Sequence, residues 1–413
     1  MCLDRETGFL AGRRGAAGQR LQHAGLRQLE RRHGGSQLAL SHRRNAGVAD
    51  ACGNRPAARV RNLDGGRGGG QGGRAGSAQR RLRAGHLHGG QHLEASHILE
   101  GVHSGLIIVD KPPGLTSHDV VARLRRLTGT RKVGHAGTLD PMATGVLVIG
   151  INKATRLLTY IVGTAKTYRA TIRLGASTLT DDAEGEITGS TTTAPVTDAA
   201  IHAGIAALTG EIMQVPSSVS AIKVKGERAY ARVRAGEDVV LAARGVTVHS
   251  FQLQAMHRLT AKNPAGEEAE FIDLDVTVEC SSGTYIRALA RDLGAGLGVG
   301  GHLTALRRTR VGPYDLGQAK TLEQLEQQAD NDGAVQILDI TDAARALMPV
   351  RELTDAEASE LSFGRWIAPS LTGLHSVAQP AAAFRPDGEL VALLADAGSQ
   401  AKPVLVFTPD LGA

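Results

Sequence analysis

The stretch Gly134-His-Ala-Gly-Thr-Leu-Asp-Pro-Met-Ala-Thr-Gly145 is the most informative part of the sequence. Its glycines predict a loop whose backbone can approach a ligand closely. Asp140 precedes Pro141, which biases the aspartate toward an extended backbone. Because no second catalytic carboxylate, Ser–His pair or metal cluster accompanies it, Asp140 suits nucleophilic attack better than paired acid–base work. The simpler alternative is a structural turn, since Asp-Pro in a glycine-rich loop is usually that.

Strand and helix patterns alternate on both sides of this stretch. The apolar runs at 106–109 and 146–149 are typical of short buried strands. One helix is expected over 117–128, with Ser117 as its N-cap, and a short one over 153–161.

The central part of the chain continues this mixture. Residues 166–174 and 271–280 alternate apolar and polar side chains, as half-buried strands do. A turn at Gly283 and a helix from about Thr284 follow. Because strands and helices mix without regular βαβ repetition, we expect an α+β fold and no doubly wound sheet.

The last 65 or so residues read as a separate small β-rich module. Thr354 and Glu357 form a capping box for a short helix. Strand-like segments at 365–368 and 404–407 flank a hairpin around Pro386-Asp-Gly388.

The first hundred residues differ from the rest in charge and composition. They hold 17 Arg, no Lys and 7 acidic residues, whereas the remainder has a balance of −4, so the overall net charge of +6 comes from this segment. With 20 Gly and a single aromatic, Phe9, the segment cannot bury enough apolar surface to offset its ordering entropy. We therefore expect residues 1–103 to be a disordered extension.

Three interpretations of this extension compete: an RNA-binding arginine-glycine arm, an organelle transit peptide, and upstream DNA translated through a misplaced start. We favour the third, because Arg, Gly and Ala have GC-rich codons and the composition changes abruptly at Gly105. Val102 would then be a good candidate for the start. Mass spectrometry of the native N-terminus tests this, and peptides from residues 10–90 would exclude it.

The remaining composition indicates a cytoplasmic protein without membrane contact. Cys2, Cys52 and Cys280 match no metal or disulfide spacing, which fits a reducing compartment. No apolar run approaches the length of a membrane span, and the N-terminus has no compact apolar region of a secretory signal.

The stretch around Asp140 resembles the GHxGxLDPxATG signature of the TruB family of tRNA pseudouridine synthases. Further motifs match the family in order, so a chance match over residues 104–310 is excluded in practice. They are Asp110-Lys-Pro-Pro-Gly114 with Thr116-Ser117, Lys166-Thr-Tyr168, Arg173-Leu-Gly175 with a Thr-rich loop ending at Asp182 and Gly185, Gln214-Val-Pro-Ser-Ser-Val-Ser-Ala-Ile-Lys223, Gly283-Thr-Tyr-Ile-Arg287 and Leu303–Arg308.

The resemblance implies a pseudouridine synthase catalytic domain with a mixed, mainly antiparallel sheet over residues 104–345. It implies an RNA-contacting insertion at about 212–245. The C-terminal module, residues 346–413, is similar to the family's PUA-like RNA-binding domain. The implied reaction converts a flipped-out uridine of the tRNA T-loop, position 55, into pseudouridine, in a monomeric enzyme that needs no cofactor or metal.

The resemblance also assigns three catalytic residues. Asp140 falls on the family's nucleophile, and attack at C6 of uracil or at C1′ of ribose both stay open. Tyr168 falls on the tyrosine that stacks on the base, although it could be an ordinary core tyrosine. Arg287 falls on the arginine that pairs with the nucleophile. Its place near a helix N-terminus, where the macrodipole disfavours a cation, supports a carboxylate partner, and the alternative is a surface arginine.

Five further residues are predicted to contact the substrate. His135 falls on a histidine that holds the T-loop open, and Leu306 on an apolar residue beside the base, for which a plain helix-core position is the alternative. Lys223 and Lys225 of the insertion are phosphate-contact candidates, or part of a solvated charged loop. Lys111 of the opening motif completes the set.

Two clusters of basic residues flank the motifs and predict local phosphate binding, because local charge matters more than net charge. They are Arg123, Arg125, Arg126, Arg131 and Lys132, and Arg307, Arg308 and Arg310. Two other functions remain: a non-catalytic RNA-binding or RNA-folding protein on the same scaffold, and a guide-RNA-dependent synthase subunit.

Overall fold

The computed structural model describes residues 103–413 except 218–222, 225–226, 229–240, 264–265, 371–372, 374 and 408–413. The predicted N-terminal extension therefore lies outside the described residues apart from His103.

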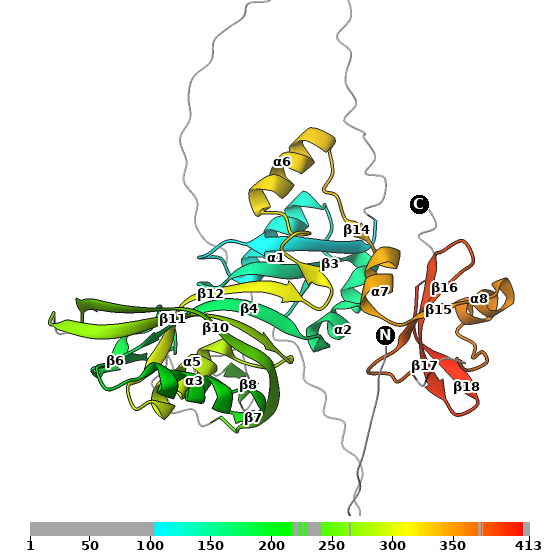
Figure 1. Cartoon of the computed structure of the whole chain (residues 1–413). Coiled ribbons are helices and arrows are strands. Elements are labelled where there is room, and N and C mark those ends of the chain that lie inside the picture. The colour runs from blue at the N-terminus through cyan, green and yellow to red at the C-terminus, as the bar shows by residue number, and fades with distance from the viewer. Residues whose placement is uncertain are drawn as a thin grey trace, which may run out of the picture. The chain divides into compact units, whose positions relative to one another are not determined.

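One large sheet organises the described chain (Figure 1). Its pairs are antiparallel except β3 with β12, which run parallel and pair only at Thr144 with Arg307 and at Gly145 with Arg308. This junction joins the two halves of the sheet, and the mixed, mainly antiparallel α+β fold is confirmed. In order across the sheet the strands are β14 (Leu338–Asp339), β1 (Gly105–Lys111), β3 (Thr144–Ile151), β12 (Gly301–Val311), β4 (Lys166–Leu174), β11 (Glu268–Cys280), β10 (Arg244–Lys262) and β7 (Gly210–Gln214), with β2 (Val133–Ala136) beside β3 and β13 (Tyr314–Asp315) beside β12.

Helices from distant parts of the chain cover one face of this sheet and share one apolar core with it. Val120 and Leu124 of α1, Ile201 of α3, and Leu289 and Leu293 of α5 pack with the inward side chains of the strands. Of these helices, α1 and α5 are amphipathic, so burying their apolar faces stabilises them and the sheet together. The helices are α1 (Ser117–Leu127), α3 (Asp198–Ala207), α5 (Ile286–Gly296) and, further along, α6 (Leu322–Asp332).

A second apolar core lies on the other side of β1 and β3. Leu106 and Ile108 point into it, whereas Ile107 and Val109 point into the first core, as strand alternation requires. The elements packed there are the 3₁₀ helix η1 (Asn152–Arg156), α2 (Leu158–Gly163) and α7 (Ile340–Leu347).

Three local predictions were wrong in detail. The N-cap of α1 is Thr116, whose side chain accepts from the Asp119 N–H in a capping box, and Ser117 is buried instead. The segment expected as one helix over 153–161 is divided between η1 and α2. Leu306 lies in strand β12, so the helix-core alternative for this residue is also wrong.

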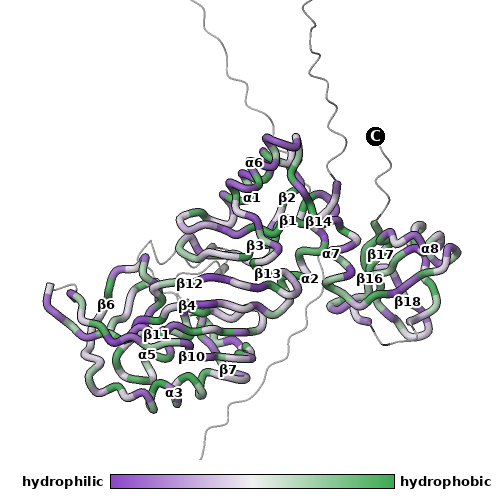
Figure 2. Tube along the Cα trace, turned by 45° about the horizontal axis from the view of Figure 1, so that its top comes forward, coloured by the Kyte–Doolittle hydropathy of each residue, from purple (hydrophilic) through white to green (hydrophobic). Residues whose placement is uncertain are grey.

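The C-terminal module has its own four-stranded sheet, and its β-rich character is confirmed. The capping box of Thr354 and Glu357 begins α8 (Asp355–Ser362) as predicted. The segment 365–368 forms only a single bridge, Ile367 with Ala401. The strands are β15 (Val350–Glu352), β16 (Ala381–Phe384), β17 (Leu390–Ala397) and β18 (Gln400–Val406), of which β16 and β17 are the most hydrophobic (Figure 2).

The predicted insertion at 212–245 leaves the sheet between β7 and β10, where Gln214 pairs with Arg244. The short strands β8 (Lys223–Val224) and β9 (Glu227–Arg228) pair within it. Another small hairpin, β5 (Ala176–Thr178) with β6 (Ile187–Ser190), carries the Thr-rich loop. Within the described ranges, no helix has the length and apolar character needed to cross a bilayer.

Candidate active site

The loop that carries Asp140, residues 137–143, connects β2 to β3 and is fixed on both sides of the aspartate. The Ser117 hydroxyl accepts from the Leu139 N–H (2.9 Å) and donates to the Leu139 carbonyl (3.2 Å). The carbonyl of Pro141 accepts from the Gly114 N–H (2.8 Å) and from the Lys111 ammonium (3.2 Å). We call residues 137–143 the Asp140 loop.

Arg308 holds the Asp140 loop from the opposite half of the sheet. Its buried guanidinium donates to the carbonyls of Val146 (2.8 Å), Gly137 (3.0 Å) and Thr138 (3.4 Å). Gly145 has a φ of +97°, and a Cβ there would lie 2.1 Å from the Arg308 carbonyl. Glycine is therefore required where the two strands meet.

Arg287 joins two carboxylates beneath this loop. Its Nη2 lies 3.1 Å from Oδ2 of Asp140, and its Nη1 lies 3.1 Å from Oδ2 of Asp182 and 2.8 Å from the Thr180 carbonyl. The side chain of Arg287 is 5 % exposed and that of Asp182 3 %, whereas that of Asp140 is 38 % exposed. The Asp140 carboxylate is thus the accessible member of a buried ion network.

Two carboxylates compensate the buried positive charge of Arg287, which is the second residue of α5. A cation at a helix N-terminus opposes the macrodipole, and a buried charge without a partner costs several kcal/mol, on the order of 3–5. Asp182 is held in turn by the Thr180 hydroxyl (2.5 Å) and the Glu184 N–H (3.1 Å). The expected contact of Arg287 with Asp140 is present.

The protonation of Asp140 reflects competing influences. Loss of hydration raises the pKa of its carboxyl above the ordinary value, and the negative charge of Asp182 acts in the same direction. Arg287 and Lys111 oppose this by favouring the charged form. The Asp140 carboxylate is consequently less stable as an anion than the carboxylate of an exposed aspartate.

Tyr168 and Leu306 lie in the same apolar core as Leu139 of the Asp140 loop. They come from the adjacent strands β4 and β12, where Leu306 pairs with Ala170 and Tyr168 pairs with Arg308. Burial raises the pKa of the Tyr168 phenol, with Arg308 opposing it. Tyr168 is therefore a protonated phenol at neutral pH.

His135 lies on β2, with its ring edge-to-face against that of His118 at 5.4 Å between centroids. Burial, and then the neighbouring His118 and Arg308, lower its pKa, so the imidazole is neutral at pH 7. Its Nδ1 is buried and has no hydrogen-bond partner among the described residues.

The three lysines predicted to contact substrate differ in position. Lys111 has no exposed surface, and its ammonium donates to the carbonyls of Pro112 (2.8 Å), Leu115 (2.7 Å) and Pro141 (3.2 Å). All three N–H groups are thus used inside the protein. Lys223 lies in β8, and Lys225 lies outside the described residues.

The basic cluster after Leu306 does not form a free phosphate-binding stripe, so that prediction was wrong. Arg308 is buried, Arg307 pairs with Asp110 at 2.6 Å, and Arg310 pairs with Glu279 at 2.7 Å. These arginines contribute mainly to the junction between the halves of the sheet.

Sequence reasoning missed three residues that support the site: Asp182, Arg308 and Ser117. Asp182 stood in a recognised Thr-rich loop, but nothing in its spacing tied it to a residue more than one hundred positions away. The glycines opposite Arg308 were a usable signal, since Gly137 borders its side chain and Gly145 borders its backbone.

A buried arginine that holds a half-exposed aspartate, on a mixed sheet of this topology, defines a pseudouridine synthase. Two solved structures agree at the level of the whole chain. "Structure of H/ACA RNP bound to a substrate RNA containing 2'-deoxyuridine" matches with a TM-score of 0.55 and 25 % identity, covering 75 % of this chain and 86 % of that one. "Crystal Structure of a Cbf5-Nop10-Gar1 Complex" matches with a TM-score of 0.54 and 26 % identity, covering 75 % and 85 %.

The chain belongs to the TruB family. The family model "TruB family pseudouridylate synthase (N terminal domain)" matches residues 125–286, and two C-terminal models of the same family match 287–353 and 348–408. A protein from Arthrobacter sp. (strain FB24), named tRNA pseudouridine synthase B, is 68 % identical over 74 % of this chain and 97 % of its own length. One of the same name from Thermobifida fusca is 55 % identical over 73 % and 98 %. The chain is accordingly an isomerase of the pseudouridine synthase class.

Proposed function

We propose that this enzyme isomerises uridine to pseudouridine in the T-loop of tRNA, at position 55, with Asp140 as the nucleophile. The observation that carries the proposal is the Asp140 carboxylate, which is half-exposed and held 3.1 Å from the buried Arg287 guanidinium. The names of the relatives support tRNA as the substrate class.

The proposed chemistry needs only side chains and the substrate. An Asp140 oxygen attacks C6 of the uracil or C1′ of the ribose, and the N1–C1′ bond breaks. The detached base turns, C5 bonds to C1′, and the bond between the Asp140 oxygen and the substrate carbon breaks, which frees the carboxylate. The C5 proton then leaves and N1 gains a proton. Because substrate and product are isomers, the reaction transfers no electrons to or from an external group and calls for no cofactor.

Arg287 acts by keeping the attacking carboxylate ionised and oriented, which places a nucleophile before the reacting atom at low entropic cost. Tyr168 and Leu306 would enclose the base between an aromatic ring and an aliphatic side chain. Since burial raises the pKa of Tyr168, we assign it stacking and donation by the phenol, in preference to a role as a phenolate base.

Substrate contacts follow from the same arrangement. A base inside a folded loop must leave its stack, which costs a few kcal/mol, roughly 2–4, and the neutral His135 would fill the vacated space. Lys223 and Lys225 remain proposed phosphate contacts. For Lys111 the buried ammonium favours a positioning role, because it ties Pro112 and Leu115 to the residue after Asp140.

The proposal retains the division into a catalytic domain, 104–345, and a PUA-like RNA-binding domain, 346–413. It also retains a monomeric, cytoplasmic enzyme. One tRNA per chain is the expected stoichiometry, which sedimentation of the complex would measure.

The test is pseudouridine formation in an unmodified T-stem-loop RNA, without guide RNA, by the full chain and by Asp140→Asn. We expect product at the T-loop uridine with the wild type, and loss of at least about a thousandfold in rate with the variant. An RNA whose T-loop uridine is replaced by cytidine is the control for position. Product that persists in Asp140→Asn would refute the assigned nucleophile.

Two other outcomes would favour the alternative functions. Binding of the RNA without any product would favour a non-catalytic RNA-folding protein. Product that appears only when a guide RNA is added would favour the guide-dependent class.

A further inference from the structure

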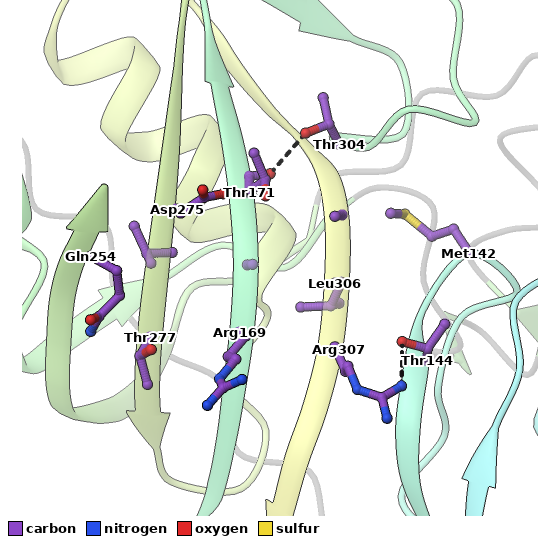
Figure 3. A pocket seen from close by; sticks show the side chains of 13 residues that line it. Met142, Thr144, Arg169, Thr171, Gln254, Asp275, Thr277, Thr304, Leu306 and Arg307 are labelled. Carbon is purple, nitrogen blue, oxygen red and sulfur yellow. Dashed lines mark hydrogen bonds between the residues drawn. The ribbon is translucent and has the colours of Figure 1, made fainter. Parts of the chain in front are cut away.

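The face of β4 opposite to Tyr168 carries an open groove of about 670 Å³ (Figure 3). Along a strand, successive side chains point to opposite faces, so Arg169 lies away from the apolar core that holds Tyr168. The groove crosses β4, β11 and β12, and Met142 of the Asp140 loop is among its lining residues.

Charges near this groove are paired across strands, with one exception. Arg173 binds Asp273 at 2.6 Å, Arg310 binds Glu279 at 2.7 Å, and Arg307 binds Asp110 at 2.6 Å. Arg169 is exposed and, within the described ranges, has no acidic partner. The arginine without an acidic partner among the described residues, Arg169, therefore lies in the groove.

The neighbours of Arg169 in the sheet add to this imbalance. In register it faces Thr277 on one side and a second arginine, Arg307, on the other. Like charges directly opposite each other destabilise a sheet. Asp110 and the Thr144 hydroxyl (3.3 Å) hold the Arg307 guanidinium on the far side of β12 from Arg169, so the charge of Arg307 is compensated there and that of Arg169 is not (Figure 3). The arrangement leaves about one uncompensated positive charge, which favours an anion.

The rest of the lining matches a ribonucleotide unit. The Asp275 carboxylate accepts from the Thr171 hydroxyl at 2.6 Å through Oδ1, and its Oδ2, which lies 3.5 Å from Nε2 of His257, has a further lone pair that can accept from a ribose hydroxyl. Gln254 offers a carboxamide at the far side, where Figure 3 draws it beyond Thr277. A carboxylate acceptor in the same groove as the uncompensated guanidinium of Arg169 suits a sugar next to a phosphate.

We propose that this groove binds the sugar–phosphate backbone of the RNA substrate outside the reacting nucleotide, with one phosphodiester against Arg169. The proposal rests on the proposed function for its RNA. A single uncompensated charge suits a phosphodiester monoanion better than a free nucleotide triphosphate, and an open groove accepts a continuous strand. Met142, which belongs to the Asp140 loop, also lines the groove.

The experiment measures the affinity of the full chain for unmodified tRNA at several salt concentrations, for wild type, Arg169→Gln and Arg169→Lys. Arg173→Gln is the matched control, because Arg173 lies on the same strand and face but is paired with Asp273. Each neutralised phosphate contributes about 0.7–0.9 to the slope of log affinity against log salt. We expect Arg169→Gln to reduce the slope by that amount and to weaken binding about fivefold at moderate salt. Arg169→Lys should restore the slope, and Arg173→Gln should leave it unchanged.

Pseudouridine formation at saturating tRNA separates the two proposals. If wild type and Arg169→Gln both form product at the same saturated rate and differ only in affinity, the groove binds RNA as inferred. If both form product and bind equally with equal slopes, the inference is refuted while the proposed function stands. If calorimetry shows Arg169-dependent binding of uridine monophosphate but Arg169-independent binding of tRNA, the groove is a free-nucleotide site and the inference is refuted. If wild type forms no product, the proposed function fails, and the salt slopes still decide whether Arg169 contacts RNA.

Discussion

Asp182→Asn isolates what the second carboxylate contributes to the active site. The amide keeps the shape of the side chain and an oxygen that can accept from Thr180 and Glu184, but it removes the negative charge. Arg287 then keeps its contacts with the Asp140 carboxylate and the Thr180 carbonyl.

The expected loss of stability is moderate. Leaving a buried arginine with no carboxylate would cost about 3–5 kcal/mol, but Asp140 remains, so the loss should approach that of one charge-assisted hydrogen bond, about 2 kcal/mol. The catalytic loss should be larger. With one anchor of the guanidinium weakened, a misplacement near 1 Å can lower the rate by about a hundredfold.

The pH dependence of the rate distinguishes an electrostatic role of Asp182 from a purely structural one, because only the electrostatic role moves the acid limb in a definite direction. The proposed nucleophile, Asp140, must be ionised to attack, so on this proposal activity falls as pH decreases through its raised pKa. The negative charge of Asp182 contributes to raising that pKa. Its removal should move the acid limb of the single-turnover rate to lower pH, even though the rate itself falls.

The assay is single-turnover pseudouridine formation from pH 4 to pH 8, with Asp181→Asn as the control. Asp181 is the neighbouring acid but pairs with Arg291 at 3.3 Å, so its variant should keep the wild-type limb. An unchanged rate and limb in Asp182→Asn, or a limb that moves to higher pH, would refute the reasoning.

Three further predictions concern the Asp140 loop and its surroundings. Gly145→Ala should lower the free energy of unfolding by roughly 3 kcal/mol, since its Cβ would meet the Arg308 carbonyl at 2.1 Å. Gly114 is also left-handed but has open space around it, so Gly114→Ala should cost only about 1 kcal/mol. Chemical denaturation measures both losses, and equal losses would contradict this. Burial raises the pKa of the Cys280 thiol to about 11, so mass spectrometry should find it unlabelled by iodoacetamide at pH 8 until urea is added, and rapid labelling of the native enzyme would count against its burial. Burial also lowers the pKa of Lys111 from 10.5 to about 8. Between pH 8 and pH 10.5 the unfolded state therefore holds more protons than the folded state, and the free energy of unfolding rises with pH by at most about 1.4 kcal/mol per pH unit. Lys111→Met should flatten this rise, and an unaltered slope would exclude Lys111 as its source.

Much of the fold follows from local sequence patterns. The alternation in β4 and β11 depends on neighbouring side chains, so it identified both strands and their buried faces. The contact between Arg287 and Asp140 was expected from the family resemblance, and the position of a cation at the start of α5 supported a carboxylate partner.

The remaining features depend on contacts between distant segments, which local patterns do not contain. Arg308 lies in a basic cluster that predicted phosphate binding, yet its guanidinium donates to the carbonyls of Gly137 and Val146. Lys111 likewise looked available until the fold brought Pro141 to its ammonium. In both cases a charged side chain found backbone partners that no spacing in the sequence indicates.

The parallel junction of β3 with β12 has a consequence for the timing of activity during synthesis. Asp140 belongs to the half of the sheet made first, whereas Arg287 and Arg308 are added much later in translation. A nascent chain that ends before α5 exposes the carboxylate without the guanidinium that orients it. The ribosome is rich in RNA, and an unfinished chain beside it has no means of modifying that RNA until β12 closes against β3.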